Sequence, residues 1–483
     1  APSNRWGYFP AAALGWRMSE EAFLNDVDWL DNLKLRVSYG EVGNDGINSS
    51  LWSQNWEATS DKRYQGAVNG AFLPSYSLGA DMANKDLKWE TTITRNIGVD
   101  FGFFNSRLTG TIDAYWNTTK DLLMKTAIPG ITGFTSTYAN VGQTSNKGIE
   151  IALQGVLVKT RDWNVTAGFN INFNRGKVDK LADNVTGLYG TEWATSSTFP
   201  KSDYVLKEGR PVGLVRGLTA DGFYTTDDFT YENGVYILKE GVADVSSAVF
   251  PNYHLHNGMN ERPAGQLAYP GMAKFKDLND DGIINDDDVD VIGDMTPVHA
   301  GGFNINATYK NFDLGLYFNW SYGNEIYNVN KLAALYGYKE GAVYENKLSI
   351  VKDCYKIYDV VNGELVALTT PEQLNAANAN AKLPLAYSEN GYVSTLGIED
   401  GSYLRLNTLT LGYTLPKSML QKAGISNLRV YGSIYNVFTI TGYSGIDAEV
   451  STSTSTKTYP QLGMDWGTYP RARSFVLGVN LSF

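Results

Sequence analysis

The residues with the most recognisable chemistry lie in an acidic segment that runs from Asp277 to Asp288. Asp, Asn and Asp occupy its first, third and fifth positions, Gly the sixth, Ile the seventh and Asp the twelfth. A calcium loop of this length takes side-chain oxygens from the first, third and fifth positions, a carbonyl from the seventh and a carboxylate from the twelfth. The spacing therefore predicts a structural Ca²⁺ whose ligands are Asp277, Asn279, Asp281, Ile283 and Asp288.

Two features of this loop keep a second interpretation open. Its last ligand position holds Asp288 instead of the usual glutamate, whose longer side chain reaches the metal with both oxygens. No helical pattern flanks the loop, so it is not one half of a helix–loop–helix pair. The alternative is a solvated acidic turn inside a longer connection.

Residues typical of catalysis are sparse. Of the three histidines, only His254 and His256 are close enough in sequence to share a metal, and no third His or Cys lies near them. Neither a Gly-x-Ser-x-Gly motif nor a glycine-rich phosphate loop occurs. The single cysteine, Cys354, excludes an internal disulfide. Nothing singles out an acid pair for glycoside hydrolysis, and we expect the protein not to be an enzyme.

The composition indicates an all-β protein that does not bind nucleic acid. The chain has 483 residues and a net charge of −11, so it lacks the basic stripe that releases phosphate counterions. Tyr, Phe, Trp and Gly are abundant, at 31, 20, 11 and 49 residues. The sequence contains no apolar run of about 18 residues, so no transmembrane helix is predicted. A membrane-spanning barrel is compatible with this composition, because its strands alternate polar and apolar residues.

Alternation with a period of two residues is clear in several segments. From residue 165 to 174, apolar Val, Ala, Phe, Ile and Phe alternate with Thr, Gly and three Asn residues. The last ten residues, up to Phe483, repeat the theme. The pattern predicts eleven strands, near 8–16, 34–40, 93–103, 107–117, 149–157, 164–174, 303–309, 312–320, 402–414, 428–438 and 474–483.

The connections between the expected strands alternate short and long. Tight turns are expected at 105–106, 159–162 and 310–311, and long stretches at 41–92, 118–148, 175–302, 321–401 and 439–473. Short turns at one end and long loops at the other are typical of outer-membrane barrels, whose short turns are periplasmic. We therefore expect 175–302, which contains the acidic loop 277–288, and 321–401 to be long extracellular loops.

Two further sets of side chains are candidates for contact with a solute. Loop aromatics can stack on sugar rings or pack against their own loops; they are Trp52, Trp56, Tyr64, Trp193, Tyr253, Tyr336, Tyr338, Tyr344 and Tyr459. Polar strand residues are expected to line a transport path or to contact a plug; they are Asp100, Asp113, Glu150, Gln154, Asn170, Asn172, Asn304 and Asn306. Neither set identifies an individual substrate contact.

The number of expected strands bears on how the barrel closes. Eleven antiparallel strands put the first and the last in the same direction, whereas bacterial single-chain barrels have even strand numbers. An open edge in lipid is not tolerated, because its N–H and C=O groups have no partners. We therefore expect the missing strands to come from another part of the same protein, connected before Ala1.

Several motifs resemble those of the SusC/RagA-like family of TonB-dependent transporters. Asn84-Lys-Asp-Leu-Lys-Trp-Glu90 is similar to the family signature Asn-Pro-Asp-Leu-Lys-Trp-Glu. The further matches are Gly15–Glu21, Leu33–Gly40, the acidic loop 277–288, Gly401–Pro416, Asn436–Phe438, Gly442–Glu449, Tyr469–Arg471 and the terminal Phe483. Together these matches span nearly the whole chain.

The resemblance implies a transmembrane antiparallel barrel of about 22 strands, of which residues 1–483 form the C-terminal half without the plug and the TonB box. It implies TonB-dependent import of oligosaccharides or peptides across the bacterial outer membrane. The implied partners are a SusD-like surface lipoprotein, a TonB complex acting through the missing N-terminal part, the remaining half of the barrel, and outer-membrane lipid. The alternatives are a passive porin, an enzyme on a barrel scaffold, and a structural barrel subunit of a larger outer-membrane assembly.

Overall fold

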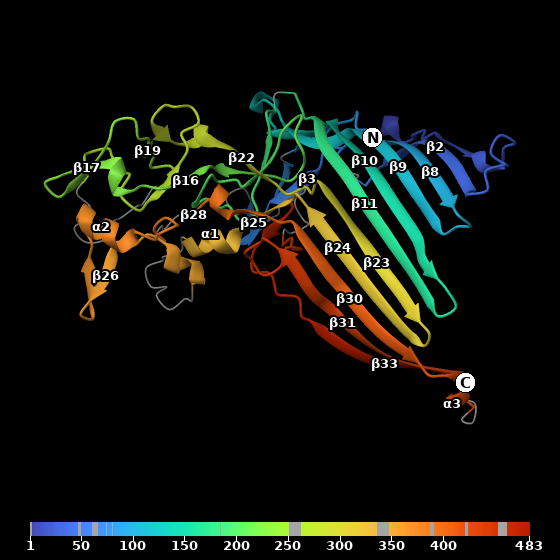
Figure 1. Ribbon diagram of the computed structural model, residues 1–483. Helices are drawn as coiled ribbons and strands as arrows, with labels where there is room; N and C mark the ends of the chain where they lie inside the picture. The colour runs from blue at the N-terminus through green and yellow to red at the C-terminus, as the bar shows by residue number, and fades with distance from the viewer. Residues whose placement is uncertain are drawn as a thin grey trace.

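The computed structural model describes residues 2–46, 50–59, 66–73, 75–79, 81–183, 185–250, 262–335, 347–386, 391–420, 424–452 and 461–483. Figure 1 shows two parts, a sheet of long tilted strands and a group of shorter elements that projects from one end of it. We call the second part the loop domain; it is formed by the described residues of 181–298 and 323–402.

The large sheet contains eleven long strands in chain order, each antiparallel to the next. They are β1 (Ala11–Arg17), β2 (Leu30–Asn44), β8 (Glu90–Phe103), β9 (Leu108–Ala127), β10 (Ser136–Lys159), β11 (Trp163–Lys180), β23 (His299–Tyr309), β24 (Phe312–Tyr322), β30 (Tyr403–Thr414), β31 (Asn427–Thr441) and β33 (Ser474–Ser482). All eleven predicted strands are thereby confirmed. A short strand, β7 (Asp81–Met82), also pairs with β10 in parallel.

One predicted connection is largely wrong. Because β9 continues to Ala127 and β10 begins at Ser136, the loop expected at 118–148 is reduced to residues 128–135. Residues 136–148 carry polar side chains on both faces of the strand. Strict alternation is seen only where one face of a strand is apolar. The alternating pattern therefore covers only part of β10 and does not extend to the residues before 149.

The two faces of the sheet have opposite character. Residues that lie opposite each other in the register share a face, as Ile151 and Ile171 do on one side and Glu150 and Asn172 on the other. On the apolar face Leu477 is 89% exposed. Such a continuous apolar surface is stable only when lipid covers it.

Short turns close one end of the sheet, and the long connections leave from the other (Figure 1). Between β8 and β9, Phe104, Asn105 and Ser106 have φ angles of 59°, 59° and 57°. Between β23 and β24, Lys310 has a φ of 52°. These left-handed residues allow the chain to reverse within a few residues, as predicted for these positions.

The sheet is open along two edges. Within the described part of the chain, β1 pairs only with β2, and β33 pairs only with β31. The prediction that the eleven strands do not close on one another is therefore confirmed. Backbone N–H and C=O groups along these edges require partners in lipid, because no water is there to satisfy them.

The remaining elements are short. In the connection between β2 and β8 lie β3 (Trp56–Thr59), β4 (Ala67–Val68), β5 (Ala71–Phe72) and β6 (Ser75–Leu78). Between β11 and β23 lie β12 (Leu188–Gly190), β13 (Thr198–Phe199), β14 (Tyr204–Leu206), β15 (Leu214–Leu218), β16 (Ala220–Phe223), β17 (Phe229–Glu232), β18 (Val235–Leu238), β19 (Asp244–Val245), β20 (Ala273–Phe275), β21 (Ile283–Ile284) and β22 (Val289–Asp294). Later come β25 (Glu325–Asn328), α1 (Val329–Leu335), β26 (Tyr358–Val361), β27 (Glu364–Ala367), α2 (Pro371–Asn378), β28 (Gly391–Tyr392), β29 (Ile398–Asp400), α3 (Lys417–Leu420) and β32 (Met464–Asp465). Among the described residues, no helix is both long enough and apolar enough to cross a membrane.

The loop domain has a hydrophobic core of its own. Leu218, Tyr224, Ile284 and Leu332 are completely buried in one cluster that draws residues from both long connections. Pairing of β13 with β28 and of β25 with β32 joins segments that are far apart in the sequence. The segments predicted as two long loops therefore fold together as one packed unit, because their apolar residues bury one another.

Candidate functional site

The polar face of the sheet carries charged groups that pair across strands. Arg36 on β2 donates through Nε to Asp100 on β8 at 2.9 Å and through Nη2 to Asp113 on β9 at 2.9 Å. Asn96 donates to Asp113 at 2.8 Å. Gly98 lies between Arg36 and Asp113 in the register, and a Cβ there would clash with both side chains. The glycine thus leaves room for an ion pair that spans three strands.

The polar strand residues selected from the sequence share this face. The register aligns all of them on one side of the sheet: Asp100, Asp113, Glu150, Gln154, Asn170, Asn172, Asn304 and Asn306. Asn172 donates to Glu150 at 2.9 Å, and the Tyr317 hydroxyl donates to Asn306 at 3.1 Å. Because several of these side chains bond to one another, the face carries a connected network of polar groups.

A buried ion cluster ties the connection before β33 to this face of the sheet. Arg405 on β30 is 3% exposed and pairs with Asp447, with Glu449 at 3.0 Å and with the Thr439 hydroxyl at 3.0 Å. Arg471 also contacts Glu449, at 2.9 Å. The connection is thereby held where β32 can pair with β25 of the loop domain.

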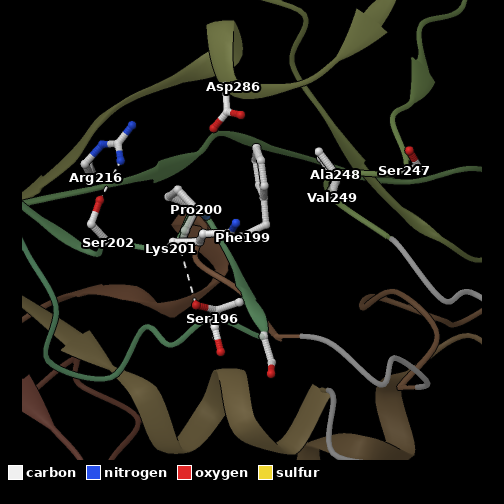
Figure 2. Close-up of a pocket in the computed structure, with 12 residues that line it drawn as sticks. Ser196, Phe199, Pro200, Lys201, Ser202, Arg216, Ser247, Ala248, Val249 and Asp286 are labelled. Carbon is white, nitrogen blue, oxygen red and sulfur yellow. Dashed lines mark hydrogen bonds between the residues drawn. The ribbon is translucent and has the colours of Figure 1, made fainter. Parts of the chain in front are cut away.

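A pocket of about 460 Å³ lies within the loop domain (Figure 2). Its floor is apolar and includes Phe199 and Val249, which are buried. Charged groups stand around it: Lys201, Arg216 of β15, and Asp286 from the short helical turn that ends the acidic loop. Hydroxyl groups complete the lining, from Ser196, Ser197, Thr198, Ser202 and Ser247. Four separate parts of the chain therefore supply the walls: 196–202, Arg216, 247–249 and Asp286.

Arg216 is held in a defined position at one end of the pocket. Its guanidinium lies over the Tyr189 ring at 4.8 Å and donates through Nη1 to the Ser202 hydroxyl at 2.7 Å. Burial lowers the pKa of Arg216, while the nearby Tyr189 and Asp286 oppose that shift. A guanidinium stays charged in proteins, so the pocket keeps a fixed cation with further N–H donors.

The backbone beside the pocket is fixed by a buried carboxylate. Asp203 is completely buried and accepts hydrogen bonds from the amides of Glu192, Trp193 and Ala194 at 2.8, 2.8 and 3.0 Å. Burial raises the pKa of Asp203, and these three amide donors work against that shift. The chain on either side of pocket residues 196–202 is thus held together, because residues 192–194 bond to Asp203.

The first half of the acidic loop brings the predicted calcium ligands together. The Asp281 amide donates to Asp277 at 3.3 Å and to Asn279 at 3.2 Å, and the Gly282 amide donates to Asp277 at 2.7 Å. The Ile283 amide donates to Asp281 at 2.8 Å, and Gly282 has a φ of 84°. Three of the predicted side chains therefore converge on one turn, and their oxygens keep further lone pairs.

The last predicted ligand, Asp288, bonds to the backbone of the loop with both carboxylate oxygens. Asp288 is completely buried and accepts from the Leu278 amide at 2.7 Å and from the Asn285 amide at 2.8 Å, so both its oxygens close the loop. Within the described residues, no three His, Cys, Asp or Glu side chains gather as a metal-binding group. The calcium site stays a prediction that rests on two carboxylates, the Asn279 amide and the Ile283 carbonyl.

Other candidates from the sequence meet different outcomes. His254, His256 and the aromatic residues Tyr64, Tyr253, Tyr336, Tyr338, Tyr344 and Tyr459 lie outside the described residues. Trp193 packs against the core of the loop domain, whereas Trp56 is 66% exposed. Burial raises the pKa of Cys354 to about 11, so the thiol is protonated at neutral pH.

Sequence reasoning missed the pocket. Its residues show no motif, because Ser, Thr and Lys in the segment 196–202 are typical of any loop. The one available signal is the position of Asp286 inside the acidic loop, for which the sequence predicts either a metal site or a solvated turn.

The architecture defines a class of protein. A sheet with a lipid-facing apolar side, a polar opposite side and a folded domain at one end is part of the wall of a transmembrane β-barrel. The model of the TonB dependent receptor-like, beta-barrel family matches residues 1–269, and the chain belongs to this family.

Similar proteins agree with this assignment. The chain is 30% identical to the TonB-dependent receptor P3 of Formosa agariphila over 490 residues, which cover 100% of the chain and 42% of that receptor. It is also 30% identical to the TonB-dependent receptor SusC of Bacteroides thetaiotaomicron, over 99% of the chain and 40% of SusC. The chain therefore spans about two fifths of the length of these curated relatives.

Solved structures show the same fold. The RagAB peptide transporter matches 100% of the chain with a TM-score of 0.70 at 24% identity, and 44% of that transporter chain is covered. The RagAB peptide importer in its closed-closed state matches with a TM-score of 0.71 at 23% identity, again over 100% of this chain and 44% of the other.

Proposed function

We propose that this chain forms part of the wall, and the loop domain, of a TonB-dependent importer in a bacterial outer membrane. The importer moves oligosaccharides or peptides inward, and no catalytic step is assigned to it. The observation that carries the proposal is the joining of a lipid-facing sheet to a packed loop domain in a chain of the TonB-dependent receptor-like family. The similar fold of the RagAB peptide transporter supports peptides as one class of imported solute.

The proposed importer needs parts outside this chain. The free edges of β1 and β33 support pairing with the remaining strands of the barrel. A TonB complex would supply energy through an N-terminal part of the protein outside this chain. The relatives are more than twice as long as this chain, which supports such a part. The loop domain projects beyond the sheet and offers a surface to a SusD-like surface lipoprotein (Figure 1). Outer-membrane lipid covers the apolar face, and nucleic acid has no role.

Purification from native outer membranes in mild detergent tests this proposal. We expect mass spectrometry to find the remaining barrel strands, a plug and a surface lipoprotein in equal amounts with this chain. We also expect uptake of labelled oligosaccharide or peptide to stop when the inner-membrane proton gradient is collapsed. Recovery of this chain as a folded monomer without partners contradicts the proposal.

Two other functions give different results in the same experiments. A passive porin continues to admit solute after the gradient is collapsed. A structural barrel subunit copurifies with a larger assembly, and its deletion dissolves that assembly while uptake continues. The packed loop domain favours the importer, because a passive pore requires no such domain.

We also propose that the acidic loop 277–288 binds a structural Ca²⁺. Support comes from the convergence of Asp277, Asn279 and Asp281 on one turn, with the Ile283 carbonyl following. Titration calorimetry of the intact barrel should detect one Ca²⁺ site, and Asp277→Ala and Asp281→Ala should each weaken it. Asp290→Ala, just outside the loop, is the matched control. Absence of binding to the unmutated barrel rules the site out.

A further inference from the structure

The pocket of the loop domain carries an excess of positive charge. Lys201 and Arg216 are cationic and Asp286 is the one acidic residue of the lining, which leaves one positive charge. The whole chain has a net charge of −11, so this local excess opposes the general charge of the protein. A pocket of this kind selects a solute with a single negative group, because a neutral solute gains nothing from the excess.

Lys201 is available to a ligand. It stands exposed at the pocket, and no ion-pair partner for it occurs in the part of the chain that the structure describes. Arg216 stands at the same pocket, already oriented by Tyr189 and Ser202. A preoriented guanidinium loses little freedom on binding, and its fork of N–H groups matches the two oxygens of a carboxylate.

The apolar part of the pocket argues against recognition by stacking on a sugar ring. Phe199 is 6% exposed and Val249 is completely buried, so neither presents a broad face to a ligand. Figure 2 shows Arg216 toward one side of the pocket and Ser247 toward the other, with Asp286 and Phe199 between them. The accessible groups are the two cations, one carboxylate and the hydroxyls, which recognise polar and charged parts of a solute.

We propose that this pocket binds a carboxylate group of the imported solute, with Lys201 and Arg216 as its partners and the neighbouring hydroxyls as further donors. The inference rests on the proposed import function and makes its substrate class acidic. The carboxylate belongs either to a uronic acid of an oligosaccharide or to a peptide. Asp286 opposes solutes with more negative charge, since it lies on the same pocket.

Calorimetry with the complete barrel in detergent tests the proposal. The probes are a trisaccharide of galacturonic acid with its methyl ester, and a short peptide with a free C-terminus and its amide. We expect the free acid of one pair to bind about tenfold more tightly than its neutral form, as for a charge-assisted contact of about 1.4 kcal/mol. The pair that shows this preference identifies the source of the carboxylate.

Two variants and a control locate the effect. Lys201→Gln should reduce the preference severalfold, and Arg216→Gln should abolish it. Lys201 is exposed, so its substitution leaves the fold intact even if Arg216→Gln disturbs it. Lys239→Gln, at an exposed lysine outside the pocket, should change nothing.

The outcomes separate this proposal from the importer function. If acid and neutral forms bind equally, or if Lys201→Gln keeps the whole preference, the pocket assignment is wrong while import of the neutral form still supports the importer. If none of the four probes binds, the pocket assignment is wrong, and the importer function is still decided by the purification and uptake experiments described above.

Discussion

In the sheet, Leu477 and Phe475 are 89% and 71% exposed, whereas in the loop domain Leu218 and Ile284 are completely buried. Large apolar side chains are therefore exposed in one region of the chain and buried in the other. The difference shows that the two regions are surrounded by different solvents. Lipid replaces the core for the sheet, and the loop domain, which meets water, must bury its apolar side chains against one another.

The largest effect should come from a charge in the core of the loop domain. Leu218→Asp places a carboxylate in the hydrophobic core of the loop domain, and should cost about 4 kcal/mol or more. Limited proteolysis should then cut the loop domain while the sheet strands stay protected. Leu365→Asp, at a residue 69% exposed on β27, is the control and should be silent. Equal protection of both variants would mean that the loop domain has no independent core.

Removal of the cation that joins the two regions should have the next largest effect. Arg405→Met leaves Asp447 buried with Arg471 as its remaining cationic partner and the Glu449 amide as a further donor, at a cost of about 3 kcal/mol. The connection that contains β32 should become sensitive to protease. The comparison variant is Arg429→Met, because Arg429 pairs with Asp313 on the sheet and is 24% exposed. A larger effect at Arg429 would show that the cluster at Arg405 does not hold the connection.

A charge on the lipid face should cost less than either change. Phe169→Arg puts a guanidinium against lipid and should destabilise the barrel by about 2 kcal/mol. Asn170→Arg, one position along β11 and on the polar face, should change stability by less than about 0.5 kcal/mol. Equilibrium unfolding in lipid vesicles measures both. Equal costs would contradict the assignment of faces.

The smallest effect concerns the pH dependence of the loop domain. Burial pushes the pKa of Glu399 upward, but hydrogen bonds from Ser444 and the Lys331 ammonium at 3.1 Å outweigh it and hold the pKa below 4.5. A carboxyl with a lowered pKa contributes stability above its ordinary pKa, and that contribution is lost as pH falls through the folded value. Acidification below about pH 4.5 should therefore cost about 1 kcal/mol in the natural protein.

Glu399→Gln removes this titration. The variant should be less stable at neutral pH, and the difference from the natural protein should shrink on acidification. Glu364→Gln, at an exposed residue of β27, provides the control. Thermal unfolding of the loop domain between pH 3 and pH 7 is the measurement. A constant difference across this range would assign the stability to packing and not to charge.

The sequence predicted the sheet well because alternation is a local property. All eleven strands were found, and turns such as Asn105–Ser106 lie where expected. The prediction failed at 118–148, where β9 and β10 continue beyond the alternating pattern. It also missed the loop domain, because no period marks a core assembled from two connections far apart in the chain.

By itself, the sequence determined which face of each strand meets lipid and that eleven strands do not close, since both follow from period and count. Only the tertiary structure decided that Lys201, Arg216 and Asp286 surround one pocket. Their approach depends on pairing of β13 with β28 and of β15 with β22, which joins residues that are close only after folding. Long-range pairing of this kind leaves no repeating signal in the chain, because each contact is made once.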